Sequence, residues 1–231
     1  MATSFILKFI KKEKVAKNIY SFYFDKRDYK LDFLPGEYIR MTLGIPRPDS
    51  RGSSRYFTIA SSPLNKKYLI VTTKIIRSTF KKRLLDLKTG ELVKFFGPMG
   101  NFTLGKIDKR PKVFLSGGMG ITTFYSMLLY FAQTKSSQNI NLIAFFSDRD
   151  NFIYKEELTE ISKEFSNIKI IYLSSKESGR ISKDIINKYA KIKNSEFYVV
   201  GPPSFVEAAK EILKELGVSE KNINLEDFTG Y

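Results

Sequence analysis

Arg55, Tyr56, Phe57 and Thr58 are consecutive residues that bring a permanent cation, two aromatic rings and a hydroxyl into one segment of strand character. Side chains alternate along a strand, so Arg55 and Phe57 lie on one side and Thr58 on the other. A guanidinium binds a diphosphate, an aromatic ring stacks on a planar heterocycle, and a hydroxyl bonds a ring nitrogen. The segment therefore suits a flavin, although these four residues alone fit a surface arginine beside a core phenylalanine better.

Two glycine-containing turns form a second group of candidate binding residues. Gly117-Gly118-Met119-Gly120 follows an apolar segment and opens a helix, and Gly201-Pro202-Pro203 does the same later in the chain. In a parallel sheet both turns emerge at one edge, where glycine lets the backbone approach a pyrophosphate. The spacing differs from Gly-x-Gly-x-x-Gly, and a tight turn with a helix-starting proline explains each turn as well. Two such turns at one edge favour a shared dinucleotide ligand.

A third turn at that edge, Ser147-Asp148-Arg149, bears on which dinucleotide binds. Ser147 and Arg149 suit a ribose 2′-phosphate, as in NADPH. Asp148 suits the free ribose hydroxyls of NADH. The sequence leaves the choice open.

Cysteine and histidine are both absent from the 231 residues. This excludes disulfides, thiolate nucleophiles, cysteine-ligated zinc or iron–sulfur sites, and nucleophiles activated by histidine. We expect no metal site, and we expect an organic cofactor to carry any difficult chemistry.

The net charge of +15 has several possible origins, among them nucleic acid, an anionic membrane, an acidic protein partner and a lysine-rich composition. Lysines occur in almost every segment, without an arginine cluster or a nucleic-acid motif. This favours composition first and an acidic protein partner second. Lys8 comes too early for a signal peptide, and no apolar run approaches the roughly 18 to 20 residues of a membrane span. We therefore expect a cytoplasmic protein.

The pattern of strand-like and helix-like segments along the chain predicts two domains, residues 1–106 and residues 107–231. Short β-rich segments and one helix, from residue 78 or 79 to about 89, predict an N-terminal antiparallel β-barrel. Its strands are expected at residues 5–12, 19–24, 37–43, 56–60, 68–76 and 92–96. Alternation of strands and helices in the second half predicts a C-terminal α/β domain with a doubly wound parallel sheet. Its strands are expected near 113–115, 142–146, 168–173, 197–200 and 223–225, and its helices near 121–133, 154–165, 182–190 and 205–216.

Taken in order, these motifs resemble the ferredoxin–NADP reductase superfamily over essentially the whole chain, specifically its single-chain members without a ferredoxin domain. Arg55, Phe57 and Thr58 match the family's Arg-x-Tyr-Ser/Thr signature, with phenylalanine in place of the commoner tyrosine. The other matching segments are Pro35 to Tyr38, Ser78 to Lys81, Gly97 to Phe102, Gly117 to Thr122, Gly201 to Pro203 and Glu226 to Tyr231. Val200 stands where many members carry cysteine, and Thr123 replaces a common proline.

The resemblance implies an FAD-binding barrel domain and an NAD(P)-binding α/β domain. The implied FAD-binding residues are Arg55, Tyr56, Phe57, Thr58, Thr73, Lys74, Ser78, Thr79 and Phe80. The implied nicotinamide-nucleotide residues are Gly117, Gly118, Gly120, Ile121, Thr122, Ser147, Arg149, Gly201, Pro202 and Phe228. Thr58 is the implied hydrogen-bond donor near the flavin N5, and Glu226 is a candidate for proton delivery.

The implied activity is hydride transfer from NAD(P)H to bound FAD, and from there to an acceptor such as an acidic ferredoxin or flavodoxin. Three alternatives stay open. The protein could be a flavin reductase that releases reduced flavin, an electron-transfer subunit of a larger redox complex, or a non-catalytic nucleotide-binding module.

Overall fold

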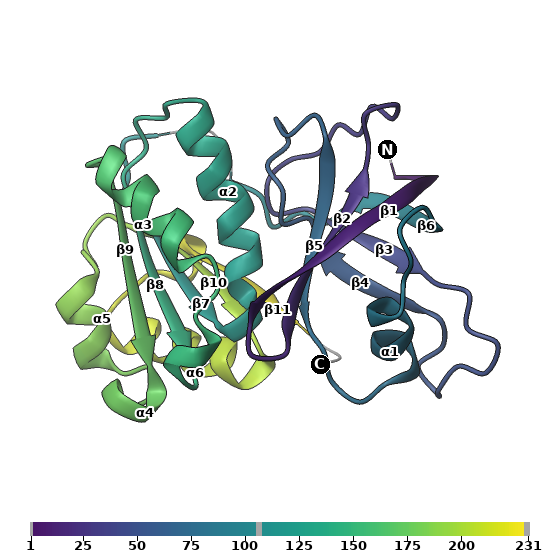
Figure 1. Ribbon diagram of the computed structural model, residues 1–231. Coiled ribbons are helices and arrows are strands. Elements are labelled where there is room, and N and C mark those ends of the chain that lie inside the picture. Colours follow the sequence, from purple (N-terminus) through teal and green to yellow (C-terminus); the bar gives the residue numbers. More distant parts are fainter. Residues whose placement is uncertain (1, 105–107, 229–231) are drawn as a thin grey trace. The chain divides into compact units, whose positions relative to one another are not determined.

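The computed structural model describes residues 2–104 and 108–228 of the chain (Figure 1). It divides into an N-terminal unit, Met1–Thr103, and a C-terminal unit, Leu104–Tyr231. The predicted boundary between residues 106 and 107 lies outside the described residues, as do Thr229, Gly230 and Tyr231. Within the described parts of the chain, no helix is both long enough and apolar enough to cross a membrane.

The N-terminal unit is a six-stranded antiparallel sheet in the order β4-β3-β6-β1-β2-β5, as the β-rich sequence predicts. Its elements are β1 Thr3–Ala16, β2 Ile19–Asp25, β3 Tyr38–Thr42, β4 Ser54–Thr58, β5 Tyr68–Lys74, α1 Thr79–Leu85 and β6 Leu92–Met99. The Ala60 N–H donates to the Ile70 carbonyl, which links the chain after β4 to β5 at the other end of that order. The short helix α1 lies between β5 and β6.

Strand β1 is longer than predicted and continues past residue 12 to Ala16. Ala16 pairs with Ile19, so Lys17 and Asn18 form a two-residue turn, with Asn18 at a φ of 57°. Asparagine tolerates this left-handed conformation. A register shift between Phe9 and Lys11 interrupts the period-2 alternation. The alternation in the sequence therefore does not predict where the strand ends.

Aromatic side chains fill the core of the N-terminal unit. Phe5 and Leu7 are buried while Ile6 between them is 59% exposed, the alternation expected of a strand with one face in the core. Phe95 stacks on Phe5 with ring centroids 5.4 Å apart and meets Phe24 edge-on at 5.0 Å. Because this face of β1 and β6 faces the core, the even-numbered residues of β6 and of β1 before its register shift, such as Ile6 and Lys8, face outward.

The C-terminal unit is a five-stranded parallel sheet in the order β11-β10-β7-β8-β9, which confirms the predicted doubly wound α/β fold (Figure 1). Its strands are β7 Lys112–Gly117, β8 Ile140–Phe146, β9 Ile168–Ser174, β10 Glu196–Gly201 and β11 Ile223–Asp227. Its helices are α2 Ile121–Gln133, α3 Lys155–Glu164, α4 Ser175–Ser178, α5 Lys183–Tyr189 and α6 Pro203–Glu215, with 3₁₀ turns at Gly118–Gly120, Arg149–Asn151 and Glu220–Asn222.

The chain order reverses between β7 and β10. It runs outward from β7 through β8 to β9 and then returns to form β10 on the other side of β7. At such a reversal the loops leaving the two strands diverge, and ligands bind at the carboxyl ends of the strands there. The turns after Gly117 and Gly201 are those loops.

The opposite, amino-terminal ends of β7 and β10 are joined by a buried ionic network. The Lys112 ammonium, on a residue only 4% exposed, contacts the carboxylates of Glu196 and Asp108, the latter at 3.1 Å. Arg110 bridges the same two carboxylates, and the Tyr198 hydroxyl donates to Glu196 at 3.0 Å. Burial acts to raise the pKa of Glu196, but the hydrogen bond and charge of Lys112 outweigh it and hold that pKa below 4.5.

We predict that Glu196→Gln lowers the free energy of unfolding by about 2 to 3 kcal/mol near neutral pH, because Lys112 loses a partner while it stays buried. A carboxylate with a depressed pKa stabilises the fold above its unfolded pKa, and this stabilisation is lost as the pH falls through the folded value. The difference from wild type should therefore shrink below pH 4.5. Urea unfolding followed by circular dichroism measures both effects.

The matched control is Glu160→Gln, which removes an exposed pair with Lys163 and should change stability by less than about 0.5 kcal/mol. Equal unfolding midpoints for the two variants would show that the network adds nothing.

Candidate cofactor sites

Contacts with the loop that precedes it hold the Arg55 side chain in place. Its guanidinium donates to the carbonyls of Arg51, Gly52 and Ser54 at 2.7 to 3.0 Å and to the Asp49 carboxylate at 3.1 Å. The carbon of the guanidinium lies 5.1 Å from the centroid of the Phe80 ring. Arg55 is therefore fixed in place, and a bound diphosphate would compete with Asp49 for it.

Phe57 and Tyr56 lie on opposite faces of β4. Phe57 is 6% exposed and packs against Phe80 with ring centroids 5.9 Å apart, whereas Tyr56 is 63% exposed. Thr58 is 8% exposed. The alternation predicted for this strand is present, but the structure places Phe57 in the barrel core rather than on the surface.

Lys81 is a buried cation that the sequence analysis did not single out. It is 4% exposed, its ammonium donates to the Thr73 hydroxyl, and it lies 4.8 Å from the centroid of the Phe57 ring. Burial, followed by the charges of Arg55 and Arg51, lowers the pKa of Lys81 to about 7. The signal in the sequence was its place on α1, three residues before the buried Leu84 and so on the same helix face.

An open cavity of about 700 Å³ lies beside this cluster, within the N-terminal unit. Its lining combines three cations, two hydroxyls at the start of α1 and an apolar wall. The lining residues are Asp49, Ser50, Arg51, Ile75, Ile76, Arg77, Ser78, Thr79, Lys82 and Leu85. Apolar surface suits an adenine ring and cations suit its phosphates, so these residues fit the adenosine diphosphate half of FAD.

Two of the nine predicted FAD residues line the cavity, and the other seven, Arg55 among them, do not. Ser78 and Thr79 line the cavity, and the Ser78 hydroxyl also accepts from the Lys81 N–H at 3.0 Å. Thr73 and Phe80 are fully buried beneath it. Lys74 is exposed at the end of β5 and, like Tyr56, lines no part of the cavity.

The glycines of the first C-terminal turn have different roles. A Cβ on Gly120 would lie 2.3 Å from the Val200 carbonyl oxygen, and one on Gly117 would lie 2.7 Å from the Phe205 ring. Gly118 has a φ of 53°, and a Cβ there would meet nothing within 4 Å. Gly117 and Gly120 are therefore required by packing, and Gly118 is the glycine that faces open space.

The second turn packs directly on the first. A Cβ on Gly201 would lie 2.9 Å from the Phe205 ring and 3.1 Å from the Gly117 backbone. Pro202 precedes α6 and accepts from the Phe205 N–H at 2.9 Å. The prediction that the two turns meet at one sheet edge agrees with this geometry.

Ile121 and Thr122 lie inside the C-terminal unit. Ile121 is fully buried, and the Thr122 hydroxyl, 3% exposed, donates to the Met119 carbonyl at 2.9 Å. These buried side chains hold the turn, and their contact with a nucleotide stays a prediction. The Ser116 hydroxyl, buried at the same end of β7, has no hydrogen-bond partner among the described residues. An unpaired buried hydroxyl near the carboxyl end of β7 fits an edge that binds a polar ligand.

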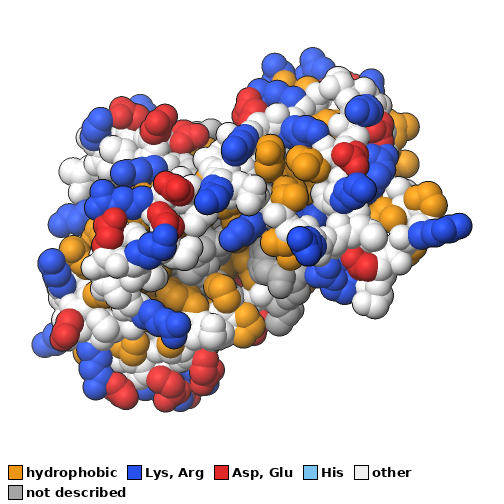
Figure 2. Space-filling view, turned by 60° about the horizontal axis from the view of Figure 1, so that its bottom comes forward, with side chains coloured by type: hydrophobic (Ala, Val, Ile, Leu, Met, Phe, Trp, Pro, Cys, Tyr) orange, Lys and Arg blue, Asp and Glu red, His pale blue; other side chains and the backbone are white. Residues whose placement is uncertain are grey.

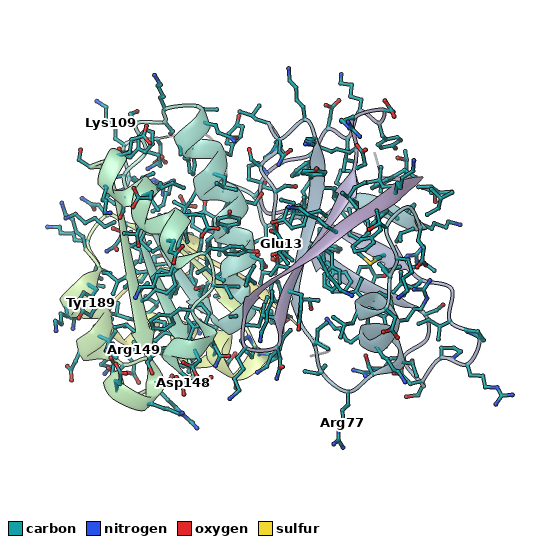
Figure 3. All side chains as sticks on the ribbon, in the orientation of Figure 1. Glu13, Arg77, Lys109, Asp148, Arg149 and Tyr189 are labelled. Atoms are coloured by element: carbon teal, nitrogen blue, oxygen red, sulfur yellow. The ribbon has the colours of Figure 1, made fainter. Side chains whose placement is uncertain are left out.

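The third turn carries two ion pairs with α4. Arg149 donates twice to Glu177, at 2.7 and 2.9 Å, and Lys176 pairs with Asp148. Figure 3 shows Asp148 and Arg149 together at the end of the sheet near α4. Ser147 accepts from the Asn151 side chain at 3.1 Å. The turn therefore presents both signs of charge.

Glu226 and Phe228 reach the same sheet edge through β11. Glu226 is paired in register with Val200, and the Phe228 N–H donates to the Gly201 carbonyl at 2.9 Å. Burial, and then the charge of Asp227, raises the pKa of Glu226 to about 7. A carboxyl group with this pKa can hold or release a proton near neutral pH.

Comparisons with known proteins match a different domain to each unit. The model of the oxidoreductase FAD-binding domain matches residues 6–104, and that of the oxidoreductase NAD-binding domain matches residues 114–211. Flavohemoprotein A of Dictyostelium discoideum is 27% identical over 235 residues, which cover 94% of this chain and 58% of that protein. The chain spans a little over half the length of the curated relatives that it matches.

Solved structures share the fold. The flavohemoglobin from Malassezia yamatoensis with bound FAD and heme is 23% identical with a TM-score of 0.83, and the match covers 97% of this chain and 60% of that one. The ferredoxin-NADP+ reductase from Plasmodium falciparum is 20% identical with a TM-score of 0.79, and the match covers 97% and 96%. With an oxidoreductase FAD-binding domain at residues 6–104 followed by an oxidoreductase NAD-binding domain at residues 114–211, the chain belongs to the oxidoreductases that combine these two domains, and it shares the fold of the ferredoxin-NADP+ reductase.

Proposed function

We propose that this chain transfers hydride from a nicotinamide dinucleotide to FAD and passes the electrons to an acidic carrier protein of the ferredoxin or flavodoxin type. The observation that supports the acidic carrier is the distribution of charge. Residues 1–103 contain 21 Lys and Arg against 8 Asp and Glu, whereas residues 104–231 contain 18 against 16. Nearly all of the +15 charge therefore belongs to the FAD-binding unit, on the right in Figure 2.

The distribution of the charge between the two units, more than the net charge, favours an acidic partner over a lysine-rich composition. A composition rich in lysine would raise the charge of both units, yet the C-terminal unit is close to neutral. A field centred on the unit that holds the flavin would attract an acidic carrier to the place where electrons leave. We infer that the acceptor is a separate protein that docks on the FAD-binding unit, and that the protein works in the cytoplasm.

The residues of each unit have separate tasks in this proposal. When bound, FAD supplies the hydride acceptor and can release electrons singly or in pairs. Arg55 and the cations of the cavity hold the diphosphate, and Thr58 donates a hydrogen bond toward the flavin N5. Gly118 lets a nicotinamide dinucleotide approach the end of β7. Glu226, on β11 at the same edge of the sheet, holds a proton.

One observation favours a second candidate, a reductase that releases its flavin. Asp49 and three carbonyls already occupy the Arg55 guanidinium, so a diphosphate must displace some of them. This competition weakens FAD binding and makes exchange easier.

The test of the function is an absorbance scan of the purified protein, followed by anaerobic titration with NADH and NADPH. We expect a flavin spectrum that bleaches with one equivalent of reduced nicotinamide. Colourless protein that still reduces added flavin would support the second candidate. Protein that neither binds nor reduces flavin would exclude both.

We predict that Arg55→Ala weakens FAD binding by about 30-fold to 1000-fold, because a charge-assisted contact with the diphosphate is worth roughly 2 to 4 kcal/mol. Asp49→Asn should have the opposite effect and tighten binding about threefold, because it removes the charge that competes for Arg55. Fluorescence titration of the flavin-free protein measures both. Arg47→Ala, at an exposed position in the same loop region, is the control, and a loss equal to that of Arg55→Ala would remove Arg55 from the site.

We predict that Gly118→Ala weakens nicotinamide binding at least about 10-fold while the unfolding midpoint changes little. A Cβ there enters the open space above β7, and the left-handed conformation costs only about 1 kcal/mol. Gly217→Ala is matched for this strain, since Gly217 also has positive φ and open surroundings. Gly120→Ala should instead destabilise the unit. Equal nicotinamide affinities for the Gly118 and Gly217 variants would contradict the assignment.

We predict that the protein prefers NADH, because a 2′-phosphate would meet Asp148 and Glu177 beside Arg149. Glu177→Gln should raise kcat/KM for NADPH at least about fivefold relative to NADH by freeing the guanidinium. Steady-state kinetics with each nucleotide checks this. Glu160→Gln, remote from this turn on α3, should leave the ratio unchanged, and an unchanged ratio in Glu177→Gln would place the 2′ position elsewhere.

A further inference from the structure

The three most exposed large hydrophobic side chains in the described residues are Leu92 at 69%, Tyr56 at 63% and Ile6 at 59%. Single exposed hydrophobics are common, but these three share one face of one sheet. They lie on β6, β4 and β1, on the outward side of strands whose intervening residues, such as Val93 and Leu7, are buried. Their common face therefore needs an explanation.

Strand register places three cations among these hydrophobic residues. Lys94 is opposite Ile6, and Lys8 is opposite Leu92. Arg40 on β3 is opposite Tyr56 on β4. We call the set Ile6, Lys8, Arg40, Tyr56, Leu92 and Lys94 the outer face.

The outward positions around these residues, up to Lys8 on β1, contain no carboxylate; past the register shift of β1, Glu13 faces the same side and is paired with Lys11. These positions are Ser4, Ile6 and Lys8 on β1, Leu92, Lys94 and Phe96 on β6, Tyr38, Arg40 and Thr42 on β3, and Ser54, Tyr56 and Thr58 on β4. The carboxylate opposite Lys8 on the neighbouring β2 is that of Asp25, and the Arg27 guanidinium binds it. The outer face is therefore cationic as well as apolar.

The aromatic part of the face is ordered by contacts within the unit. The Arg40 guanidinium lies 5.2 Å from the Phe96 ring centroid, and Tyr56 meets Tyr38 edge-on at 5.8 Å. Arginine and tyrosine are enriched among the residues that contribute most to protein–protein binding, and fixed side chains lose little entropy on association. Four adjacent strands span about 14 Å from the first to the last.

We propose that the outer face is the docking surface for the acidic carrier protein, with Ile6, Leu92 and Tyr56 as apolar contacts and Lys8, Arg40 and Lys94 as the charged ones. This inference rests on the proposed function. A carboxylate-rich surface complements the three cations, and a rigid, flat sheet face with an Arg–aromatic cluster suits a folded protein. A membrane surface is usually bound by an amphipathic helix or a lipid anchor.

Strand β4 connects this face to the predicted flavin residues. Tyr56 points outward, while Arg55 and Phe57, its neighbours in the chain, point to the other side of the strand. A carrier that contacts Tyr56 is therefore separated from Arg55 and Phe57 by a single strand, and Thr58 lies on the same side of the strand as Tyr56.

The experiment compares two triple charge reversals with equal changes of net charge. One is Lys8→Glu, Arg40→Glu, Lys94→Glu on the outer face. The control is Lys14→Glu, Lys17→Glu, Lys66→Glu at exposed positions elsewhere in the same unit. The probe is a plant-type [2Fe–2S] ferredoxin of net negative charge, with binding measured by calorimetry at about 0.1 M salt.

We expect the outer-face variant to bind the ferredoxin at least about 10-fold more weakly than wild type, and the control to stay within about threefold. Ile6→Ser with Leu92→Ser should weaken binding about 10-fold even at high salt, because it removes apolar contacts rather than charge. FAD content and the reduction of a small neutral quinone by NADH should be unchanged in all three variants.

Three results would overturn the proposal. One is an equal loss of binding in both charge variants, which would mean long-range attraction without a docking face. Another is absence of ferredoxin binding by the wild type. The third is stronger binding to phosphatidylcholine vesicles containing phosphatidylserine than to ferredoxin, with the loss confined to the outer-face variant. Failure of the wild type to reduce the quinone would instead refute the proposed function.

Discussion

A close backbone contact, with no room for a side chain, fixes the shape of the sheet edge in the C-terminal unit where the two glycine turns meet. The turn after β7 approaches the end of β10 so closely that a Cβ at Gly120 would lie 2.3 Å from the Val200 carbonyl oxygen. A Cβ on Gly201 would lie 3.1 Å from the Gly117 backbone, and the Phe205 ring packs against both glycines. Because these turns are locked together, Gly118 is held with its open side outward, and the edge keeps its shape before a ligand arrives.

The main feature of the N-terminal unit is a group of cations held close together. Arg55 is neutralised by Asp49 and by backbone carbonyls, and Lys81 reaches the Thr73 hydroxyl in a buried position that lowers its pKa. Concentrated positive charge is costly in the absence of an anion. A diphosphate would relieve this cost, which is a physical reason for a cluster that stability alone would not favour.

The sequence predicted the architecture because two periodicities were clear. Alternating apolar residues such as Phe5 and Leu7 indicated the antiparallel strands, and the strand–helix alternation after Pro111 indicated the parallel sheet. It could not predict the end of β1, where a bulge interrupts the alternation, or the short helix α4, which has too few residues to show a period. The predicted glycines are at the expected edge, but their separate roles depend on distances to Val200 and Phe205, which lie far away in the chain. Lys81 was missed because lysine is rarely buried.

The ionic network of Lys112 and Glu196 lies at the ends of β7 and β10 opposite to the glycine turns. Each of these two strands is thus anchored at one end and exposed to ligands at the other. Substitutions in the ligand-binding loops leave the anchored end untouched, so the nucleotide edge can vary without loss of the sheet. A fold arranged in this way can acquire a new nucleotide preference through changes in its loops, because the ionic network at the opposite end of the strands continues to stabilise the sheet.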